Sequence, residues 1–244
     1  MKIDTILTPA ELPALSRRDL SGAACVVFDI LRATSTFVTA LQNGAKEITP
    51  VSEISEALTL RQQQPDALLA GERDGMKIRA AQSGGPDFDL GNSPREFRAE
   101  KVRGKTIIST TTNGTRALRA CAGAKLVLAA SFLNLAVTAR YLNQSPPEEI
   151  LLVCAGTGED VAWEDVLAAG ALAGLLGGDF SDATEIAALT FLAAKADLPA
   201  VLAGTQNARR LLAIPELRAD VAFCAQRDVF KIVAVMQGGS LRVH

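Results

Sequence analysis

Short apolar runs alternate with helical patterns along most of the chain, and this alternation limits the possible folds more than any other feature. The runs are rich in β-branched residues, which favours strands, and the intervals between them carry apolar residues at helical spacing. Near-continuous apolar strands that alternate with helices are typical of a parallel sheet with both faces covered. We therefore predict an α/β fold with three layers, α/β/α, and a mainly parallel, mixed sheet.

The predicted elements are spread over the whole chain. Strands are expected at 24–29, 47–51, 67–70, 105–109, 125–129, 150–154 and 231–235. Helices are expected at 36–43, 54–63, 115–121, 133–142 and 165–176. The region from 182 to 226 is expected to be mostly helical, and it either covers the sheet or forms the interface of a homo-oligomer such as a dimer.

One internal similarity suggests a repeat. The stretch "NGAKEITPVS" (43–52) resembles "AGAKLVLAAS" (122–131) at a constant offset of 79. In both, a helix ends at Gly, a Lys and a short strand follow, and a Ser stands where the next helix would be capped. Two similar βαβ-based lobes would explain this, whereas the alternative is that Gly-Ala-Lys is a common helix-stop signal. We predict a single domain over 1–244, with sub-lobes at about 1–104 and 105–244.

Composition excludes several classes of protein. With 25 basic and 27 acidic residues, the net charge of −2 favours binding neither to nucleic acid nor to an anionic membrane. The four cysteines are widely spaced in apolar stretches, which is typical of buried thiols in a reducing compartment. The N-terminus has no sustained apolar core and does not resemble a signal peptide, so we expect a cytoplasmic protein.

The histidine count narrows the chemistry further, because the only histidine is the last residue, His244. A Ser-His-Asp triad, a Cys-His dyad, a histidine zinc site and a phosphohistidine mechanism would each lack their central group. An enzyme with this sequence must use carboxylates, Lys, Arg, hydroxyl groups or a hard metal with oxygen ligands.

Charged and hydroxyl side chains follow the first predicted strand, 24–29, in "FDILRATST" (28–36). Asp29 ends the apolar run, Arg32 lies on the turn, and Thr34 or Ser35 is placed to cap the next helix. In open parallel sheets, ligands bind beyond the carboxyl ends of the strands, where helices begin. The alternative is purely structural, with Thr34 as the cap and Asp29 paired with a neighbouring Arg.

A second loop of this kind is "STTTNGTRA" (109–117). Its backbone amides and Gly114 allow close approach of an anion, and an arginine binds phosphate oxygens in a bidentate manner. The loop lacks the glycine spacing and lysine of a Walker A motif, and a plain Asn-Gly turn is the alternative. The candidate residues here are Thr112, Asn113, Gly114, Thr115 and Arg116.

Two more segments carry candidate residues. "CAGTGEDVAWEDVLAAG" (154–170) contains Thr157, Glu164 and Asp165, although acidic residues in a first helical turn also stabilise the helix by themselves. The segment 71–97 is a long loop without periodicity, and such loops are usually functional or disordered. Its candidates are Glu72, Arg73, Asn92 and Ser93.

Together these segments place carboxylates and guanidinium groups at the ends of strands. Carboxylates bind Mg²⁺, and arginines with backbone amides bind phosphate, so the set indicates metal-assisted chemistry on a phosphate ester. Cysteine phosphatases need Arg six positions after the Cys, and none of the four cysteines has one. Haloacid-dehalogenase phosphatases need Asp two residues after the first Asp, where this chain has Leu31.

The ordered motifs resemble those of the 2-phosphosulfolactate phosphatase (ComB-like) family. They are "FDILRATSTFVTALQNGAKEI", "GER" with "KI", "FDLGNSP", "TTTNGTRAL", "ASFLNL" and "CAGT" with "EDVLAAG", and they span roughly 22–170. A weaker similarity follows at "DVAFCAQRDVF" (220–230). The segment "RAAQSGGPD" (79–87) is longer than the usual link in the family, which leaves the exact substrate open.

The resemblance implies the family's α/β fold and Mg²⁺-dependent hydrolysis of 2-phospho-3-sulfolactate to 3-sulfolactate and phosphate, in sulfolactate or coenzyme M biosynthesis. The substrate is then a small anionic phosphoester and the enzyme a phosphoric monoester hydrolase. The nucleophile is either a water molecule or a carboxylate. Implied catalytic residues are Asp29, Arg32, Asn113 and Arg116. Implied metal ligands are Asp29, Glu72, Glu164 and Asp165. Implied substrate-binding residues are Thr34, Ser35, Arg73, Asn92, Ser93, Thr112, Gly114, Thr115 and Thr157.

Two other functions stay open on the sequence alone. One is a phosphate- or sulfonate-binding protein without turnover, which the many carboxylates argue against, because a pure anion binder gains nothing from acids beside its ligand. The other is a phosphatase of the same fold that acts on a different small phosphoester.

Overall fold

The elements of the fold are taken from a computed structural model, which describes residues 1–15 and 17–244. The strands are β1 (Lys2–Ile6), β2 (Ala23–Phe28), β3 (Glu47–Pro50), β4 (Leu68–Arg73), β5 (Met76–Lys77), β6 (Thr106–Thr110), β7 (Leu126–Ala130), β8 (Glu149–Cys154), β9 (Asp179–Phe180), β10 (Ala234–Gln237) and β11 (Ser240–Val243). The α-helices are α1 (Leu12–Leu15), α2 (Ala33–Gln42), α3 (Ile54–Gln63), α4 (Ala80–Ser83), α5 (Ala99–Val102), α6 (Gly114–Ala120), α7 (Leu135–Gln144), α8 (Trp163–Leu176), α9 (Asp182–Ala194), α10 (Leu198–Ala203), α11 (Gln206–Ala213) and α12 (Arg218–Cys224). The 3₁₀ helices are η1 (Pro9–Glu11), η2 (Pro94–Glu96), η3 (Phe132–Asn134) and η4 (Lys195–Asp197).

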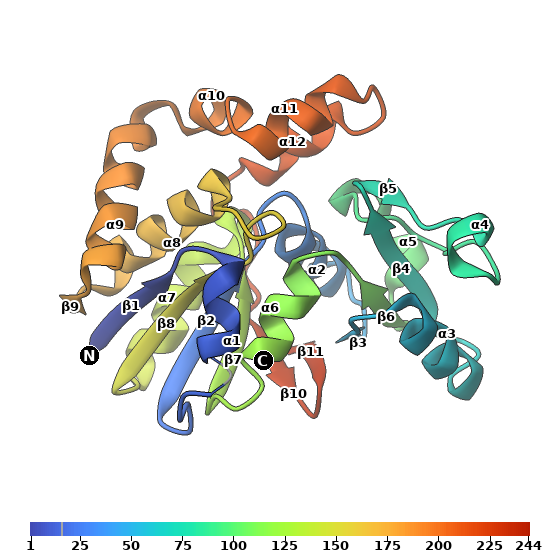
Figure 1. The fold of residues 1–244 in the computed structure, drawn as a ribbon, viewed down its shortest axis with the longest axis horizontal. Helices are drawn as coiled ribbons and strands as arrows, with labels where there is room; N and C mark the ends of the chain where they lie inside the picture. The colour runs from blue at the N-terminus through green and yellow to red at the C-terminus, as the bar shows by residue number, and fades with distance from the viewer. Residues whose placement is uncertain (16) are drawn as a thin grey trace.

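Within the described residues, the strands form one sheet in the order β5-β4-β6-β3-β11-β10-β7-β2-β8-β1-β9 (Figure 1). Strands β4, β6 and β3 pair in parallel, and so do β7, β2, β8, β1 and β9. The antiparallel hairpin β10–β11 lies between these two parallel blocks and pairs with β7 on one side and β3 on the other. The C-terminus of the chain therefore connects the two halves of the sheet.

The strand order is symmetric about this hairpin. On one side lie β3, β6 and β4, and on the other lie β7, β2 and β8. The unit β2–α2–β3 leads from the block that contains β2 to the block that contains β3. The unit β6–α6–β7 leads in the opposite direction. These units contain the two similar sequence stretches, so the backbone agrees with the predicted repeat. The boundaries of the two sub-lobes stay a prediction.

Alternate side chains of the central strands pack into two separate cores. Val26 and Phe28 of β2 pack with residues of α7, α8 and α9. Cys25 and Val27, which alternate with these two residues along the strand, pack on the opposite face with residues of α1, α2 and α6. Because neighbouring residues of a strand point to opposite faces, a fully apolar strand requires both faces to be covered. The predicted three-layer α/β/α fold with a mainly parallel, mixed sheet is confirmed.

The predicted strands and helices are found within a few residues of their expected positions, whereas several short strands were not predicted. Strand β1 reads "KIDTI" and lacks an apolar run, so it is identified by its parallel pairing with β8 and β9. The predicted strand at 231–235 begins only at Ala234, because its pairing with β7 is limited to Ala234 and Val235. The predicted loop 71–97 contains the end of β4 together with β5, α4 and η2.

The C-terminal region is mostly helical, as predicted. Figure 1 shows α10, α11 and α12 above the end of the sheet toward which the arrow of β4 points. By length and composition alone, the stretch Asp182–Ala213 is apolar enough to cross a membrane. The structure divides this stretch into α9, η4, α10 and α11, so its composition is weak evidence for a membrane span.

Helices α8 and α9 pack closely at Gly170 of α8. A Cβ atom at this position would lie 2.0 Å from the carbonyl oxygen of Ala187 in α9. We expect Gly170→Ala to lower the free energy of unfolding by about 3 kcal/mol, because two helix backbones would have to separate. Denaturant unfolding of the purified protein measures this change.

Gly174 of the same helix is the matched control, because a Cβ there would meet no atom of the described residues within 4 Å. Gly174→Ala should raise stability by about 0.5–1 kcal/mol through helix propensity. Equal effects of the two substitutions would contradict the close packing of α8 on α9.

Candidate active site

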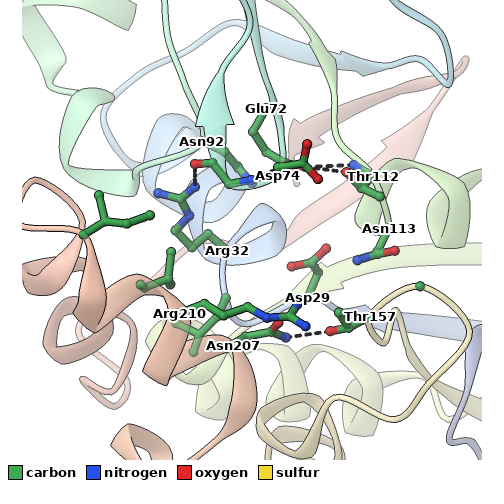
Figure 2. A pocket seen from close by; sticks show the side chains of 15 residues that line it. Asp29, Arg32, Glu72, Asp74, Asn92, Thr112, Asn113, Thr157, Asn207 and Arg210 are labelled. Carbon is green, nitrogen blue, oxygen red and sulfur yellow. Dashed lines mark hydrogen bonds between the residues drawn. The ribbon is translucent and has the colours of Figure 1, made fainter.

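Four strand ends meet at one cavity of about 490 Å³ (Figure 2). Two of them, at β2 and β8, belong to one parallel block, and the other two, at β4 and β6, belong to the other. The helix α11 supplies a further wall. The cavity is lined by Asp29, Leu31, Arg32, Glu72, Asp74, Gly75, Asn92, Thr112, Asn113, Thr157, Gly158, Asn207, Arg210, Leu211 and Ile214.

Asp29 holds the start of α2 in place while one edge of its carboxylate faces the cavity. Its Oδ1 accepts a hydrogen bond of 2.9 Å from the amide of Ala33, the first residue of the helix. Thr34 lies inside the first turn, where its hydroxyl donates to the carbonyl of Asp29 at 3.0 Å. The prediction that Thr34 or Ser35 caps this helix is therefore wrong, because the helix starts earlier and the Asp29 side chain binds its first amide. The hydroxyl of Ser35 donates to Ile30 O at 2.9 Å.

Arg32 is buried and paired with Asp220 of α12. Its Nη1 lies 2.9 Å from Asp220 Oδ2, and its Nη2 donates to the carbonyl of Gly75 at 2.5 Å. The side chains are 2% and 0% exposed. The other oxygen of Asp220 accepts a hydrogen bond of 2.7 Å from Ser93. Asp220 thus orients a guanidinium group that water barely reaches. It lies in the weaker motif at 220–230, and its role was not predicted.

The start of α6 touches the start of α2 at Gly114. A Cβ atom there would lie 2.6 Å from the Cβ of Ala33 and 2.8 Å from Asp29 Oδ2, so this close approach requires glycine. Thr112 and Asn113 line the cavity, and Gly114 and Thr115 lie behind it. The two similar loops of the repeat therefore meet at the same site.

The long loop contributes Glu72 and Asn92 to the cavity. One oxygen of Glu72 accepts bonds of 2.9 Å from both the amide and the hydroxyl of Thr112, and the other accepts one of 2.7 Å from the amide of Gly75. Arg73 points elsewhere, to the Glu72 carbonyl and the Thr110 hydroxyl, and does not line the cavity.

Glu164 and Asp165 lie buried at the start of α8, behind the cavity wall. The oxygens of Asp165 accept bonds of 2.8 and 3.0 Å from the amides of Ile30 and Gly156, so this residue fastens two of the strand ends together. Glu164 Oε1 accepts a bond of 2.6 Å from Asn207, which also donates to Thr157 at 2.7 Å. Glu164 Oε2 is buried without a hydrogen-bond partner among the described residues.

The carboxylates around Asp29 repel one another. Burial, with the nearby Glu72 and Glu164 carboxylates, raises the pKa of Asp29 to about 7, although the Ala33 amide and Arg32 oppose the shift. Burial and the charges of Asp29 and Glu164 also raise the pKa of Asp165. Such a cluster attracts a cation. Among the described residues, however, no three His, Cys, Asp or Glu side chains are arranged to hold one metal ion by themselves.

The structure brings some predicted site residues together and places others outside the cavity. The predicted residues that line it are Asp29, Arg32, Glu72, Asn92, Thr112, Asn113 and Thr157. Arg116, predicted to be catalytic, lies instead on the surface, with its Nη1 2.6 Å from the exposed Glu159. The roles assigned to all of these residues stay predictions.

The lining residues of α11 were not predicted. Asn207, Arg210 and Leu211, with Ile214 directly after the helix, recur at the three- and four-residue spacing of one helix face, which is a detectable pattern. The pattern alone could not indicate which part of the sheet this face meets. Asp74 and Gly75 follow the predicted Glu72 and Arg73 but were not singled out.

Most of the chain is similar to one family of known proteins. Residues 7–239 match the family described as 2-phosphosulpholactate phosphatase. A probable 2-phosphosulfolactate phosphatase of Caldanaerobacter subterraneus subsp. tengcongensis is 40% identical over 235 residues, which cover 94% of each chain. A relative of the same name from Thermotoga petrophila is 42% identical, over 88% of this chain and 89% of its own. One from Carboxydothermus hydrogenoformans is 36% identical, over 96% and 92%. This chain therefore belongs to the 2-phosphosulfolactate phosphatase family.

Proposed function

We propose that this enzyme hydrolyses the phosphate ester of 2-phospho-3-sulfolactate and releases 3-sulfolactate and phosphate. The observation that carries the proposal is the cavity in which four strand ends place carboxylates beside a buried arginine, in a chain whose relatives are named probable 2-phosphosulfolactate phosphatases. Asp29, Arg32 and Asn113 are the residues at these ends that suit binding and cleavage of a phosphoryl group.

Arg32 is the proposed ligand of the phosphoryl oxygens. Because Asp220 and the Gly75 carbonyl already hold its guanidinium, little reorganisation is needed as negative charge develops in the transition state. Thr112 and Asn113, directly before α6, line the same cavity. They orient the phosphoryl group relative to Asp29.

The residues present fit a hard divalent cation such as Mg²⁺. Among the residues that the structure describes, Glu164 Oε2 is buried without a hydrogen-bond partner, and the pKa of Asp29 is raised by burial beside other carboxylates. Mg²⁺ commonly uses only one or two protein carboxylates, together with water and substrate phosphate, so a complete protein cage is not required. Asp29 and Glu164 would hold the ion, whereas the oxygens of Glu72 and Asp165 already accept backbone amides. Bound there, Mg²⁺ would supply polarisation of the phosphoryl group.

We place the reaction in the cytoplasm, in sulfolactate or coenzyme M biosynthesis. The four cysteines are free and buried, which suits a reducing compartment. A second candidate is a different small phosphoester. The longer segment 79–87, which contains α4 and follows β5, is the observation that favours it.

The first prediction for this function concerns Asp29. In assays of phosphate release from 2-phosphosulfolactate with Mg²⁺, Asp29→Asn should lower kcat/KM by roughly 100-fold or more, because a charge at the reacting centre is lost. Asp160→Asn removes an exposed carboxylate outside the cavity lining and should keep activity near wild type. Wild-type activity that survives EDTA unchanged would contradict the proposed Mg²⁺ dependence.

The second prediction concerns metal binding without turnover. Millimolar Mg²⁺ should raise the melting temperature of the wild-type protein, because the ion relieves repulsion among buried carboxylates and binds only the folded chain. Asp29→Asn and Glu164→Gln should each reduce this shift, whereas Asp160→Asn should retain it. A shift of equal size in all four proteins would place the ion elsewhere.

The third prediction concerns the buried ion pair. Asp220→Asn leaves the Arg32 charge without its partner and should lower stability by about 3–5 kcal/mol. Glu159→Gln removes the exposed partner of Arg116 and should cost less than about 1 kcal/mol. Where Asp220→Asn is still folded, its kcat should also fall, because Arg32 is no longer oriented. A folded variant with unchanged kcat would limit Asp220 to a structural role.

A further inference from the structure

We propose that Arg210 binds the sulfonate group of the substrate and so selects phosphoesters that carry this second strong acid. The inference rests on the proposed function and names the residue that would give it specificity. Arg210 lies on α11 and lines the cavity. In Figure 2 its side chain lies on the opposite side of Asp29 from Glu72 and Thr112.

Arg210 differs from the other basic residue that lines the cavity. The lining residues include the acids Asp29, Glu72 and Asp74, and the bases Arg32 and Arg210. Arg32 is held by Asp220 and Gly75. Within the described residues, by contrast, no ion pair or hydrogen bond engages the Arg210 side chain. Arg210 therefore has its full hydrogen-bonding capacity available for a ligand anion.

The position of Arg210 follows from the way α11 packs. Ala208 and Leu211 of this helix are buried in the core, and the Thr205 hydroxyl accepts the amide of Ala208 at the helix start. This anchoring directs one helix face, with Arg210, toward the cavity. Arg209 is not among the lining residues and donates instead to the carbonyl of Gly204.

The two arginines suit different parts of the substrate. A buried, fixed guanidinium is suited to the charge that develops on the phosphoryl group, whereas an exposed, unpaired one is suited to ground-state binding of a group that does not react. The sulfonate extends one methylene beyond the carbon that bears the phosphoester, whereas the carboxylate is attached to that carbon directly. Leu211 and Ile214 line the cavity beside Arg210 and offer an apolar contact for this methylene.

The test compares 2-phosphosulfolactate with 2-phospholactate, which lacks the sulfonate. Arg210→Ala should lower kcat/KM for 2-phosphosulfolactate on the order of 10- to 100-fold, mainly through KM, as expected for a lost charge-assisted hydrogen bond. For 2-phospholactate the change should stay within about 3-fold. Arg210→Lys should restore part of the loss, because it keeps the charge without the bidentate fork. Arg209→Ala is the matched control and should behave as wild type.

Three results would overturn the inference. Equal losses for both substrates would mean that Arg210 binds the phosphoryl group or the carboxylate. A loss of the same size in Arg209→Ala would mean that the overall positive charge of α11, and not Arg210 itself, matters.

Calorimetric titration with 3-sulfolactate and with inorganic phosphate separates this inference from the proposed function. If the wild type turns over neither ester but binds 3-sulfolactate, and Arg210→Ala weakens only that binding, the inference stands while the function fails. If the wild type hydrolyses 2-phosphosulfolactate and Arg210→Ala has the same kcat/KM, the proposed function stands and this inference fails.

Discussion

The ion pair between Arg32 and Asp220 connects the sheet to the helices that cover it. Both charges are almost completely removed from water, so their attraction must offset a large desolvation cost, which only good geometry and further hydrogen bonds achieve. Ser93 and the carbonyl of Gly75 supply those bonds. The pair thereby brings together four distant segments of the chain: the end of β2, the β4–β5 turn, the loop before η2, and α12. The end of β2, the β4–β5 turn and the loop before η2 each contribute residues to the cavity wall.

The symmetric strand order explains why the two loops rich in hydroxyl and charged residues meet. Each strand–helix–strand unit crosses the C-terminal hairpin, so α2 and α6 start beside each other and Gly114 permits their contact. The two loops differ in chemistry although their topology is equivalent. The first supplies the charges of Asp29 and Arg32, and the second supplies amides, a hydroxyl and Asn113. A repeated backbone thus produces one site with unlike halves, which is what recognition of an asymmetric ester requires.

Buried and exposed groups occupy different regions of this candidate site. Asp29, Arg32 and Glu164 lie in a region of low exposure, where electrostatic interactions are strong and charges influence one another's protonation. The face of α11 that lines the cavity lies closer to solvent and provides Arg210 together with apolar contacts. Asn207 joins the two regions, because it donates to both Glu164 and Thr157.

The amino-acid sequence by itself determined the class of fold and most of the strand ends that carry chemistry. Apolar periodicity is a local property, and it predicted β2, β6, β7, β8 and the helices between them. Hydroxyl and charged residues directly after apolar runs likewise indicated Asp29, Arg32, Thr112 and Asn113 without any knowledge of the fold. Short strands such as β1 escaped prediction, because their stability comes from pairing with strands that are distant in sequence.

Only the tertiary structure decided which of these residues share a cavity. It placed Arg116 against Glu159 on the surface, and it turned Asp165 toward the backbone of two loops. It also brought Asp220 and Arg210 to the site from a helical region whose sequence shows no sign of what it covers. The physical reason is the same in each case: a side chain's role depends on the charges and hydrogen-bonding groups that face it, and those come from other parts of the chain.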